Sequence, residues 1–141
     1  MEIRKAKVLE ISEIKKLIDS TDEMDTTVDT FTESYFKRIQ RYGIILVAVD
    51  KKKIVGTCFG TFNLKEKWAD LLGLAVRKEF RKKGVGYDLV KSFEKEVISK
   101  KKISTIDLYA DKLQINLFKK NGYKQGRTYI AFRKVIKDGN N

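Results

Sequence analysis

The feature that most constrains this sequence is a short glycine turn between a β-rich run and a helical one. The stretch EFRKKGVGYDLV, residues 79–90, places Gly84 and Gly86 after three cations and before apolar residues at helical spacing. Glycines at the start of a helix allow another molecule to approach the backbone closely, and the first-turn N–H groups and the helix dipole favour an anion. The turn therefore predicts an anion-binding site at a strand-to-helix junction.

The composition of the chain excludes several classes of protein. The chain has 141 residues, which suits a single domain over residues 1–141, and 42% hydrophobic content excludes disorder as the main state. No apolar run approaches the roughly 20 residues of a membrane span, and the N-terminus lacks a signal-peptide core, so we expect a cytoplasmic protein. The chain has no histidine and only one cysteine, Cys58. We therefore expect no metal site, no internal disulfide and no histidine-activated nucleophile.

The net charge of +12 indicates an anionic partner or a strongly solvated surface. Nucleic acid, an anionic membrane surface and a polyphosphate ligand would all suit this charge, and charge alone does not choose among them. The basic residues are scattered and no base-stacking motif accompanies them, which argues against specific nucleic-acid binding.

Hydrophobic periodicity predicts a single α/β structure with a mixed sheet. Strands are expected at residues 3–8, in a hairpin over 44–63, and at 68–76, 103–110 and 127–136. Helices are expected at residues 9–18, 30–41, 85–100 and 113–122.

Three phosphate-binding motifs compete for the glycine turn. A P-loop requires Gly-Lys-Ser/Thr, but here lysine precedes the glycine and Val85 follows it. A dinucleotide fingerprint requires a third glycine where this chain has Leu89. The pattern Arg/Gln-x-x-Gly-x-Gly/Ala is matched at every specified position by residues 81–86.

With this motif the chain resembles the GNAT superfamily of acetyl-CoA-dependent N-acetyltransferases. A second signature of that family, Leu-Tyr-Glu-Lys-x-Gly-Phe, is echoed by residues 117–123, LFKKNGY. The resemblance extends over nearly the whole chain. It implies a GNAT fold of α/β (α+β) class, with a central mixed, mostly antiparallel sheet flanked by helices in the order β-α-α-β-β-β-α-β-α-β-β.

The resemblance also implies a co-substrate and an activity. The co-substrate is acetyl-CoA, and the activity is direct transfer of its acetyl group to a primary amine: a polyamine, a lysine side chain, an N-terminal amine or a small amine. In the family the glycine turn holds the pyrophosphate and the preceding strand lies beside the thioester. The implied cofactor-binding residues are Leu74, Ala75, Val76, Arg81, Lys82, Lys83, Gly84, Val85, Gly86, Asn116 and Phe118.

Amine acetylation needs a neutral acceptor, and an alkyl ammonium with a pKa near ~10.4 is almost fully protonated at neutral pH. In the family a glutamate acts as the base, and counting back from the LAV run of residues 74–76 places Asp70 at its position here. The side chain of aspartate is one methylene shorter than that of glutamate. On a regular strand Asp70 would share a face with Leu72, Leu74 and Val76. The alternative is that Asp70 is simply an exposed acid near the strand start.

The proton donor departs from the family pattern. The usual tyrosine is replaced by Phe118, so either Tyr109 or Tyr123 substitutes, or the thiolate leaves without a proton. This departure keeps a second hypothesis open, a non-catalytic acyl-CoA-binding or regulatory module of the same fold.

The acceptor is indicated only by charge. Residues 19–29, DSTDEMDTTVD, contain five acids and no lysine or arginine. An acidic loop favours a cationic acceptor, although a solvated linker with helix-capping acids explains the same composition. A homodimer is compatible with these features.

Overall fold

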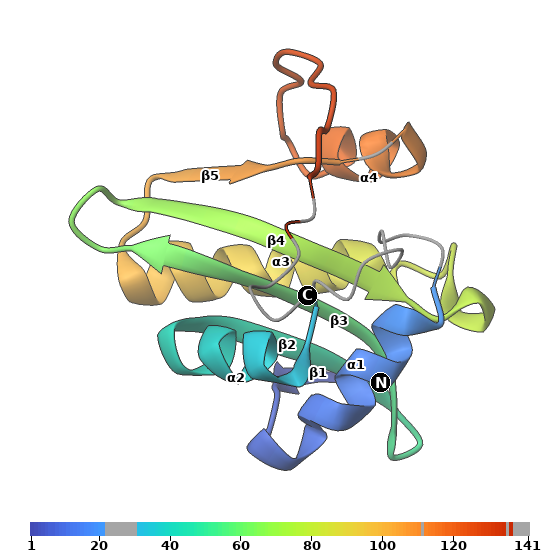
Figure 1. Cartoon of the computed structure of the whole chain (residues 1–141). Coiled ribbons are helices and arrows are strands. Elements are labelled where there is room, and N and C mark those ends of the chain that lie inside the picture. Colours follow the sequence, from blue (N-terminus) through green and yellow to red (C-terminus); the bar gives the residue numbers. More distant parts are fainter. Residues whose placement is uncertain (22–30, 111, 135, 137–141) are drawn as a thin grey trace.

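The computed structural model describes residues 1–21, 31–110, 112–134 and 136. A five-stranded sheet runs through its centre in the order β1-β2-β3-β4-β5 (Figure 1). The strands are β1 Glu2–Lys5, β2 Gly43–Asp50, β3 Lys53–Asn63, β4 Trp68–Val76 and β5 Thr105–Leu108. The first four strands pair antiparallel, and β5 pairs parallel with β4. The expectation of a mixed, mostly antiparallel sheet flanked by helices is confirmed.

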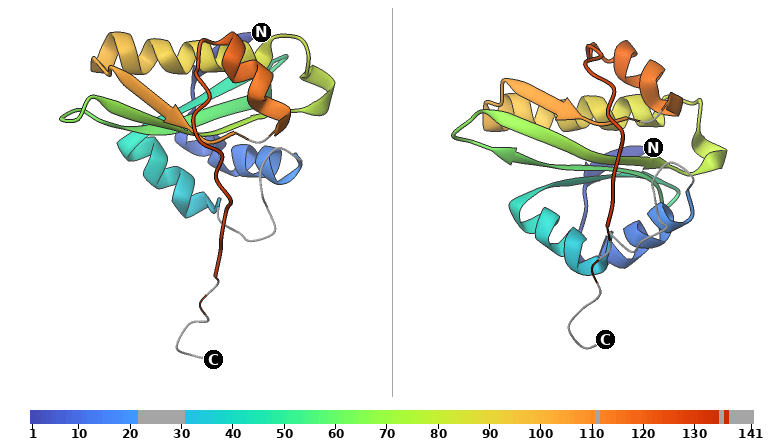
Figure 2. Two further views of the ribbon diagram at one scale, coloured as in Figure 1. Left: turned by 90° about the horizontal axis from the view of Figure 1, so that it is seen from above. Right: turned by 45° about the horizontal axis from the view of Figure 1, so that its top comes forward.

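Helices cover both faces of this sheet. On one face lie α1 (Ile11–Asp19) and α2 (Glu33–Tyr42), and on the other lies α3 (Val85–Lys95), which continues through the π-helical turn Glu96–Lys100. The short α4 (Ile115–Lys120) follows β5 at the edge of the sheet (Figure 2).

Each face of the sheet has its own apolar core. Between the sheet and α3, buried residues such as Cys58, Leu74 and Phe93 pack together. On the other face, α1 and α2 bury Phe36 against Phe59, whose ring centroids lie 5.1 Å apart. Strand residues therefore alternate between two cores, and the face that a residue takes decides which helices it meets.

A β-bulge breaks this alternation in β4. Phe59 pairs with Gly73 but Gly60 pairs with Leu71, so Leu72 is an extra residue in β4. The prediction from a regular strand that Asp70 shares a face with Leu74 is therefore wrong. Leu71 and Leu74 both pack toward α3, and Asp70 lies on the face of α1 and α2.

Two expected element ends differ from the structure for local reasons. The first strand stops at Lys5 because residues Val8–Glu10 form a 3-10 turn, in which the Glu10 carboxylate accepts from the Lys7 N–H at 2.7 Å. Helix α2 begins at Glu33 because the Thr32 hydroxyl caps it, accepting from the Tyr35 N–H at 3.1 Å.

The strands expected after α4 are absent from the part of the chain that the structure describes. Among the described residues, the chain from 123 to 134 contains no strand; it turns back beyond α4, passes β5, and only its last described part projects from the body of the protein (Figures 1 and 2). A strand requires hydrogen bonds to a neighbouring strand, and no described strand pairs with this segment. No described helix has the length and apolar character needed to cross a bilayer.

Candidate active site

The predicted anion-binding turn connects the end of β4 to the start of α3. After Val76 the chain makes a 3-10 turn at Lys78–Phe80, and Lys82 and Gly84 then adopt left-handed conformations with φ of +60° and +85°. Arg77 fixes the entry to this turn, because its Nε donates to the Ile54 carbonyl at 3.0 Å and its main-chain N–H to Val55 at 2.9 Å.

Gly84 has both the conformation and the surroundings that an anion site requires. Its left-handed φ favours glycine, and a Cβ placed there would meet no atom within 4 Å. The first intrahelical bond of α3 runs from the Asp88 N–H to the Gly84 carbonyl at 2.9 Å. The N–H groups of residues 85–87 therefore have no carbonyl partner within the helix, which is the arrangement that binds phosphate at a helix N-terminus.

Cationic side chains surround this helix start. Arg77, Lys78, Arg81, Lys82 and Lys83 belong to the turn, against one acid, Glu79. Arg81 donates from Nε to the Val76 carbonyl at 2.9 Å, and the Lys83 ammonium lies 5.6 Å from the centre of the Phe80 ring. Charge and geometry together fit the pyrophosphate of a nucleotide-like ligand.

Next to the turn, β4 and β5 separate. The two strands pair only from Trp68 to Leu71 on β4, while β4 continues to Val76. The Leu74 carbonyl faces this opening, since the Gln114 side chain approaches it at 3.5 Å from the far side. In an antiparallel strand a residue directs its N–H and carbonyl to the same side, so the Leu74 N–H points into the opening too.

The other residues predicted to bind the cofactor lie around the opening between β4 and β5 or in the two apolar cores of the sheet. A Cβ on Gly86 would lie 3.5 Å from Leu117 and 3.8 Å from Leu74, so the start of α3 packs close to both β4 and α4. Val85 is buried in the α3 core, and Ala75 turns to the opposite core.

On α4, the two predicted residues differ in exposure. Asn116 is exposed. Phe118 is buried among the α3-side core residues, with its ring centroid 5.7 Å from that of Tyr123. The phenylalanine that replaces the family tyrosine thus has a packing role in this fold.

The two candidate proton donors occupy different environments. Tyr109 follows the end of β5 and is 82% exposed, with its ring 5.7 Å from that of Tyr129. Tyr123 packs against the α3 core, where burial and the nearby Glu94 carboxylate raise the pKa of its hydroxyl. Tyr123 is therefore directed into the protein, and Tyr109 toward solvent.

Asp70 has an acidic neighbour that sequence reasoning missed. In the parallel pairing of β4 with β5, Asp70 lies beside Asp107, and both are exposed. Trp68 and Thr105 pair two positions earlier and so point to the same face. All four of these residues are exposed, so α1 and α2 do not cover this half-face of the sheet. A signal was present, because the strand sequences WADL and TIDL carry aspartate at matching positions.

Gln114 was missed as well, because a lone glutamine between a strand and a helix has no pattern of its own. Of the acidic segment, Asp19 is exposed at the end of α1 and pairs with Lys15 at 2.9 Å. Residues 22–29 of that segment lie outside the described residues.

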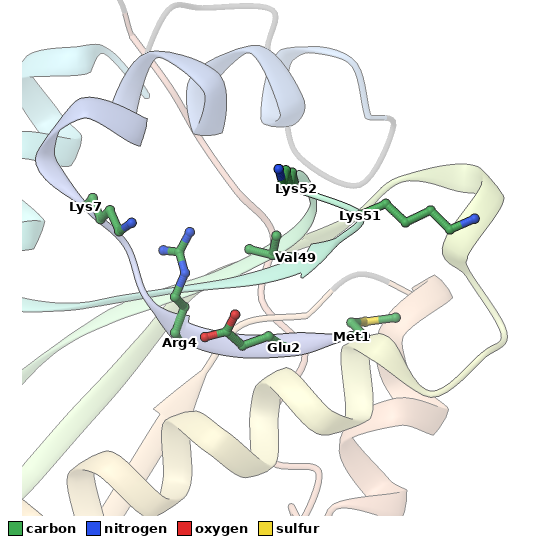
Figure 3. Close-up of a pocket in the computed structure, with 7 residues that line it drawn as sticks. All are labelled: Met1, Glu2, Arg4, Lys7, Val49, Lys51 and Lys52. Carbon is green, nitrogen blue, oxygen red and sulfur yellow. The ribbon is translucent and has the colours of Figure 1, made fainter.

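A basic hollow on another part of the surface contains none of the predicted site residues (Figure 3). It lies beside the two-residue turn of Lys51 and Lys52 that joins β2 to β3. Its lining residues are Met1, Glu2, Arg4, Lys7, Val49, Lys51 and Lys52. Arg4 is already engaged by Glu10, to which it donates twice at 2.8 Å.

Known proteins resemble this chain in sequence and in overall structure. The chain is 27% identical over 139 residues to an uncharacterized N-acetyltransferase of Chlorobaculum tepidum, an alignment covering 99% of this chain and 85% of that one. A predicted acetyltransferase from Clostridium acetobutylicum, solved with acetyl-CoA, superposes with a TM-score of 0.74 at 19% identity, covering 94% and 95% of the two chains.

An aminoglycoside acetyltransferase from an uncultured soil metagenomic sample, solved with trehalose, superposes with a TM-score of 0.72 at 15% identity and 96% coverage of both chains. These structural likenesses show the fold. The family model described as "Acetyltransferase (GNAT) domain" matches residues 41–125, a span from the end of α2 through the glycine turn and α4. The protein therefore belongs to the GNAT acetyltransferase family.

Proposed function

We propose that this protein is an N-acetyltransferase that moves the acetyl group of acetyl-CoA directly to a primary amine. The observation that carries the proposal is the cationic turn with left-handed Gly84 at the point where β4 and β5 separate. We place the enzyme in the cytoplasm and treat residues 1–141 as a single domain.

The glycine turn would hold the pyrophosphate of acetyl-CoA. The N–H groups of Val85 and Gly86 would donate to it, with charge from Arg81, Lys82 and Lys83. Residues 74–76 would run beside the pantetheine chain, because Leu74 directs its main-chain groups into the opening between β4 and β5. Asn116 and Phe118 on α4 would border the other side.

Acetyl transfer then requires a polarised thioester carbonyl. We assign this role to a main-chain N–H at the end of β4, near Leu74, because a fixed donor at the carbonyl oxygen stabilises the charge that develops when the amine attacks. No side chain is needed for this step, and no covalent acyl-enzyme is formed.

The acceptor side is the exposed half-face of β4 and β5. Asp70 would take the proton from the ammonium group of the acceptor, through a water if the short side chain does not reach. Its neighbour Asp107 adds a second negative charge on the same face. Two carboxylates side by side favour a cationic amine, such as a polyamine or an aminoglycoside, over a neutral one.

For the leaving thiolate we propose Tyr109 as the proton donor in preference to Tyr123. Tyr109 continues the face of Asp107 beyond the paired part of β5 and is accessible to solvent. The pKa of the half-buried Tyr123 is raised by burial and by the Glu94 carboxylate on α3. A thiolate that leaves unassisted is the alternative, and a Tyr109→Phe variant with full activity would favour it.

The decisive experiment is a calorimetric titration of the protein with acetyl-CoA. A matched pair of variants accompanies it: Gly84→Glu, which fills the anion site with a negative side chain, and Gly126→Glu, at a glycine whose Cβ also meets no atom within 4 Å. We expect one-site binding for the wild type and Gly126→Glu, and none for Gly84→Glu. Failure of the wild type to bind would contradict the proposal.

Turnover separates the enzyme from the alternative binding module. We would measure thiol release with polyamines, aminoglycosides and lysine peptides as acceptors. Asp70→Asn should lower kcat by about a hundredfold or more, as expected when a general base is removed. Asp107→Asn should mainly raise KM for a cationic acceptor. Binding of acetyl-CoA without turnover on any amine would support the non-catalytic module instead.

A further inference from the structure

The basic hollow beside the turn that joins β2 to β3 takes no part in the acetyl transfer proposed above. Figure 3 shows Lys7 and Arg4 at one end of it and Lys51 and Lys52 at the other, with Val49 between them. Its volume is about 540 Å3, within the range of about 300 to 1,000 Å3 that small-molecule sites occupy. The hollow is therefore large enough for one small ligand.

The charge of the hollow favours an anion. Its lining contains four cationic side chains and one acidic one, namely Arg4, Lys7, Lys51, Lys52 and Glu2. The Glu10 carboxylate, which pairs with Arg4, adds a second negative charge at its border. Four positive charges against two negative ones leave an excess of two. Lys51 and Lys52 form no ion pair with an acid in the described part of the chain, so a compact dianion would balance this excess.

The turn at the hollow has a backbone conformation that its residues do not favour. Lys51 and Lys52 have φ of +48° and +65°, which lies in the left-handed region. Two-residue hairpin turns with positive φ usually have the sequence Asn-Gly, because most other side chains are strained there. The two strands need only the shape of the turn, so lysine at both positions adds charge at the rim of the hollow without helping the fold. Such local strain is typical of binding sites.

Hydrogen bonds hold the walls of the hollow in place without a ligand. The Glu10 carboxylate accepts two bonds at 2.8 Å from the Arg4 guanidinium, which attaches β1 to the residue before α1. The hairpin is fixed at its base, where Arg77 donates from Nε to the Ile54 carbonyl at 3.0 Å. The Ile54 N–H in turn approaches the Glu13 carboxylate of α1 at 3.4 Å. A ligand would thus meet a largely preformed site, which lowers the entropy cost of binding.

Phosphate is the anion that this lining fits best. A phosphate monoester is close to a dianion at neutral pH, whereas a single carboxylate carries one charge. Lysine ammonium groups bind phosphate oxygens as point charges, without the planar match that arginine requires. The lining residues that the structure describes include no aromatic side chain, so the hollow offers no platform on which nucleic-acid bases could stack.

We propose that the basic hollow binds the phosphate group of a small phosphorylated ligand. Lys7, Lys51 and Lys52 supply the charge, and Arg4, held by Glu10, completes one wall. A soluble phosphate ester and a lipid headgroup that ends in a phosphate monoester share this chemistry. The site is separate from the glycine turn, so the inference goes beyond the proposed function and does not depend on acetyl-CoA binding.

The first test locates the binding by following backbone amide chemical shifts during a titration with inorganic pyrophosphate. We expect saturable shifts at residues 2–7 and 49–53, and a separate set at residues 82–87 if the glycine turn also takes the probe. The shifts thus distinguish failure of this proposal from failure of the proposed cofactor site. Shifts confined to residues 82–87, or shifts at the hollow that do not saturate, would overturn the proposal.

A pair of charge-matched variants tests the role of the turn. Lys51→Asn combined with Lys52→Gly keeps a favourable turn sequence and removes both charges, so the protein should unfold at the same temperature or higher. Its affinity for pyrophosphate at the hollow should fall by about tenfold or more, because two of the four cations are lost. The control is Lys65→Asn combined with Lys67→Gly in the turn between β3 and β4, where Lys67 is also left-handed with φ of +54°. Equal loss of affinity in the two variants would show that only net charge matters and would contradict a site.

Two further probes identify what carries the phosphate. Saturable binding of glycerol phosphate that the Lys51→Asn/Lys52→Gly variant loses would support a soluble ligand. Co-sedimentation with vesicles containing phosphatidic acid, but not with vesicles containing phosphatidylserine, would support a lipid headgroup with a phosphate monoester. Binding of duplex RNA that depends on the same lysines, without binding of pyrophosphate, would assign the hollow to a nucleic-acid backbone and overturn the proposal.

Discussion

Arg81 donates from Nε to the main-chain carbonyl of Val76 at 2.9 Å. The first residue of the glycine motif is thereby attached to the last residue of β4. The strand that lies beside the opening and the turn that carries the cations are consequently held as one unit. This bond gives the arginine of the motif a structural role in addition to its charge.

The bond between Arg81 and Val76 predicts that Arg81→Lys is not a conservative change. Lysine keeps the charge but loses the planar guanidinium, whose Nε donates to the Val76 carbonyl and holds the turn. We expect acetyl-CoA binding weaker by about tenfold, corresponding to ~1.4 kcal/mol, measured by calorimetry. Arg38→Lys, at an exposed position on α2, serves as the control and should bind normally. Unchanged affinity in Arg81→Lys would show that only the charge matters.

The bulge in β4 predicts a stability effect at Gly60. A Cβ on residue 60 would clash with the Asp70 carbonyl oxygen and lie 2.8 Å from the Phe93 ring, so the strands must shift to accept it. We expect Gly60→Ala to lower the free energy of unfolding by about 3 kcal/mol, measured by chemical denaturation. The matched variant Gly126→Ala, with no atom within 4 Å of the added Cβ, should be nearly neutral.

The ion pair of Arg4 and Glu10 predicts a pH dependence of stability. Hydrogen bonds from the Arg4 side chain lower the pKa of Glu10 from 4.5 to about 2. Burial of the carboxyl opposes this shift, and a hydrogen bond from the Lys7 N–H adds to it. A carboxyl whose pKa is depressed on folding stabilises the protein above its unfolded pKa, and that contribution is lost as the pH falls from about 4.5 toward 2.

Glu10→Gln should therefore lower the free energy of unfolding by about 1 kcal/mol at pH 7, since the pair is bidentate but partly solvated. The difference from the wild type should shrink as the pH approaches 2. The measurement is denaturant unfolding at pH 7 and at about pH 3, with Glu66→Gln, at an exposed position, as the control. A difference that stays constant between the two pH values would argue against the ion pair as its source.

The buried thiol predicts chemical inertness. Cys58 is fully buried in the α3-side core, and burial raises the pKa of its thiol, so the reactive thiolate is suppressed. A disulfide reagent such as Ellman's reagent should react with the native protein only at the rate of unfolding, and at once in denaturant. Rapid reaction of the native protein would contradict the burial of this side chain.

The glycine motif could be identified from sequence because its structure is local. Gly84 adopts its left-handed conformation, and α3 begins at Val85, through preferences of neighbouring residues alone. The core positions of α3 followed in the same way from the spacing of Leu89, Val90 and Phe93.

The orientation of Asp70 could not be obtained that way. A regular strand would have placed it with Leu74, but the bulge at Leu72 reverses the alternation. The bulge depends on the pairing of Gly60 with Leu71 across two strands, which a period-two pattern does not contain. The neighbour Asp107 comes from a strand that follows a whole helix, and only the parallel pairing of β4 with β5 brings it beside Asp70.

By itself, then, the sequence determined the order of the elements through β5 and α4, the family, and the strand-to-helix turn with its glycines and cations. Tertiary structure decided the face on which Asp70 lies, the separation of β4 from β5, and the absence of a strand after α4 among the described residues. The reason is physical: helix starts and left-handed turns depend on adjacent residues, whereas registers, bulges and strand pairing depend on hydrogen bonds between segments far apart in the chain.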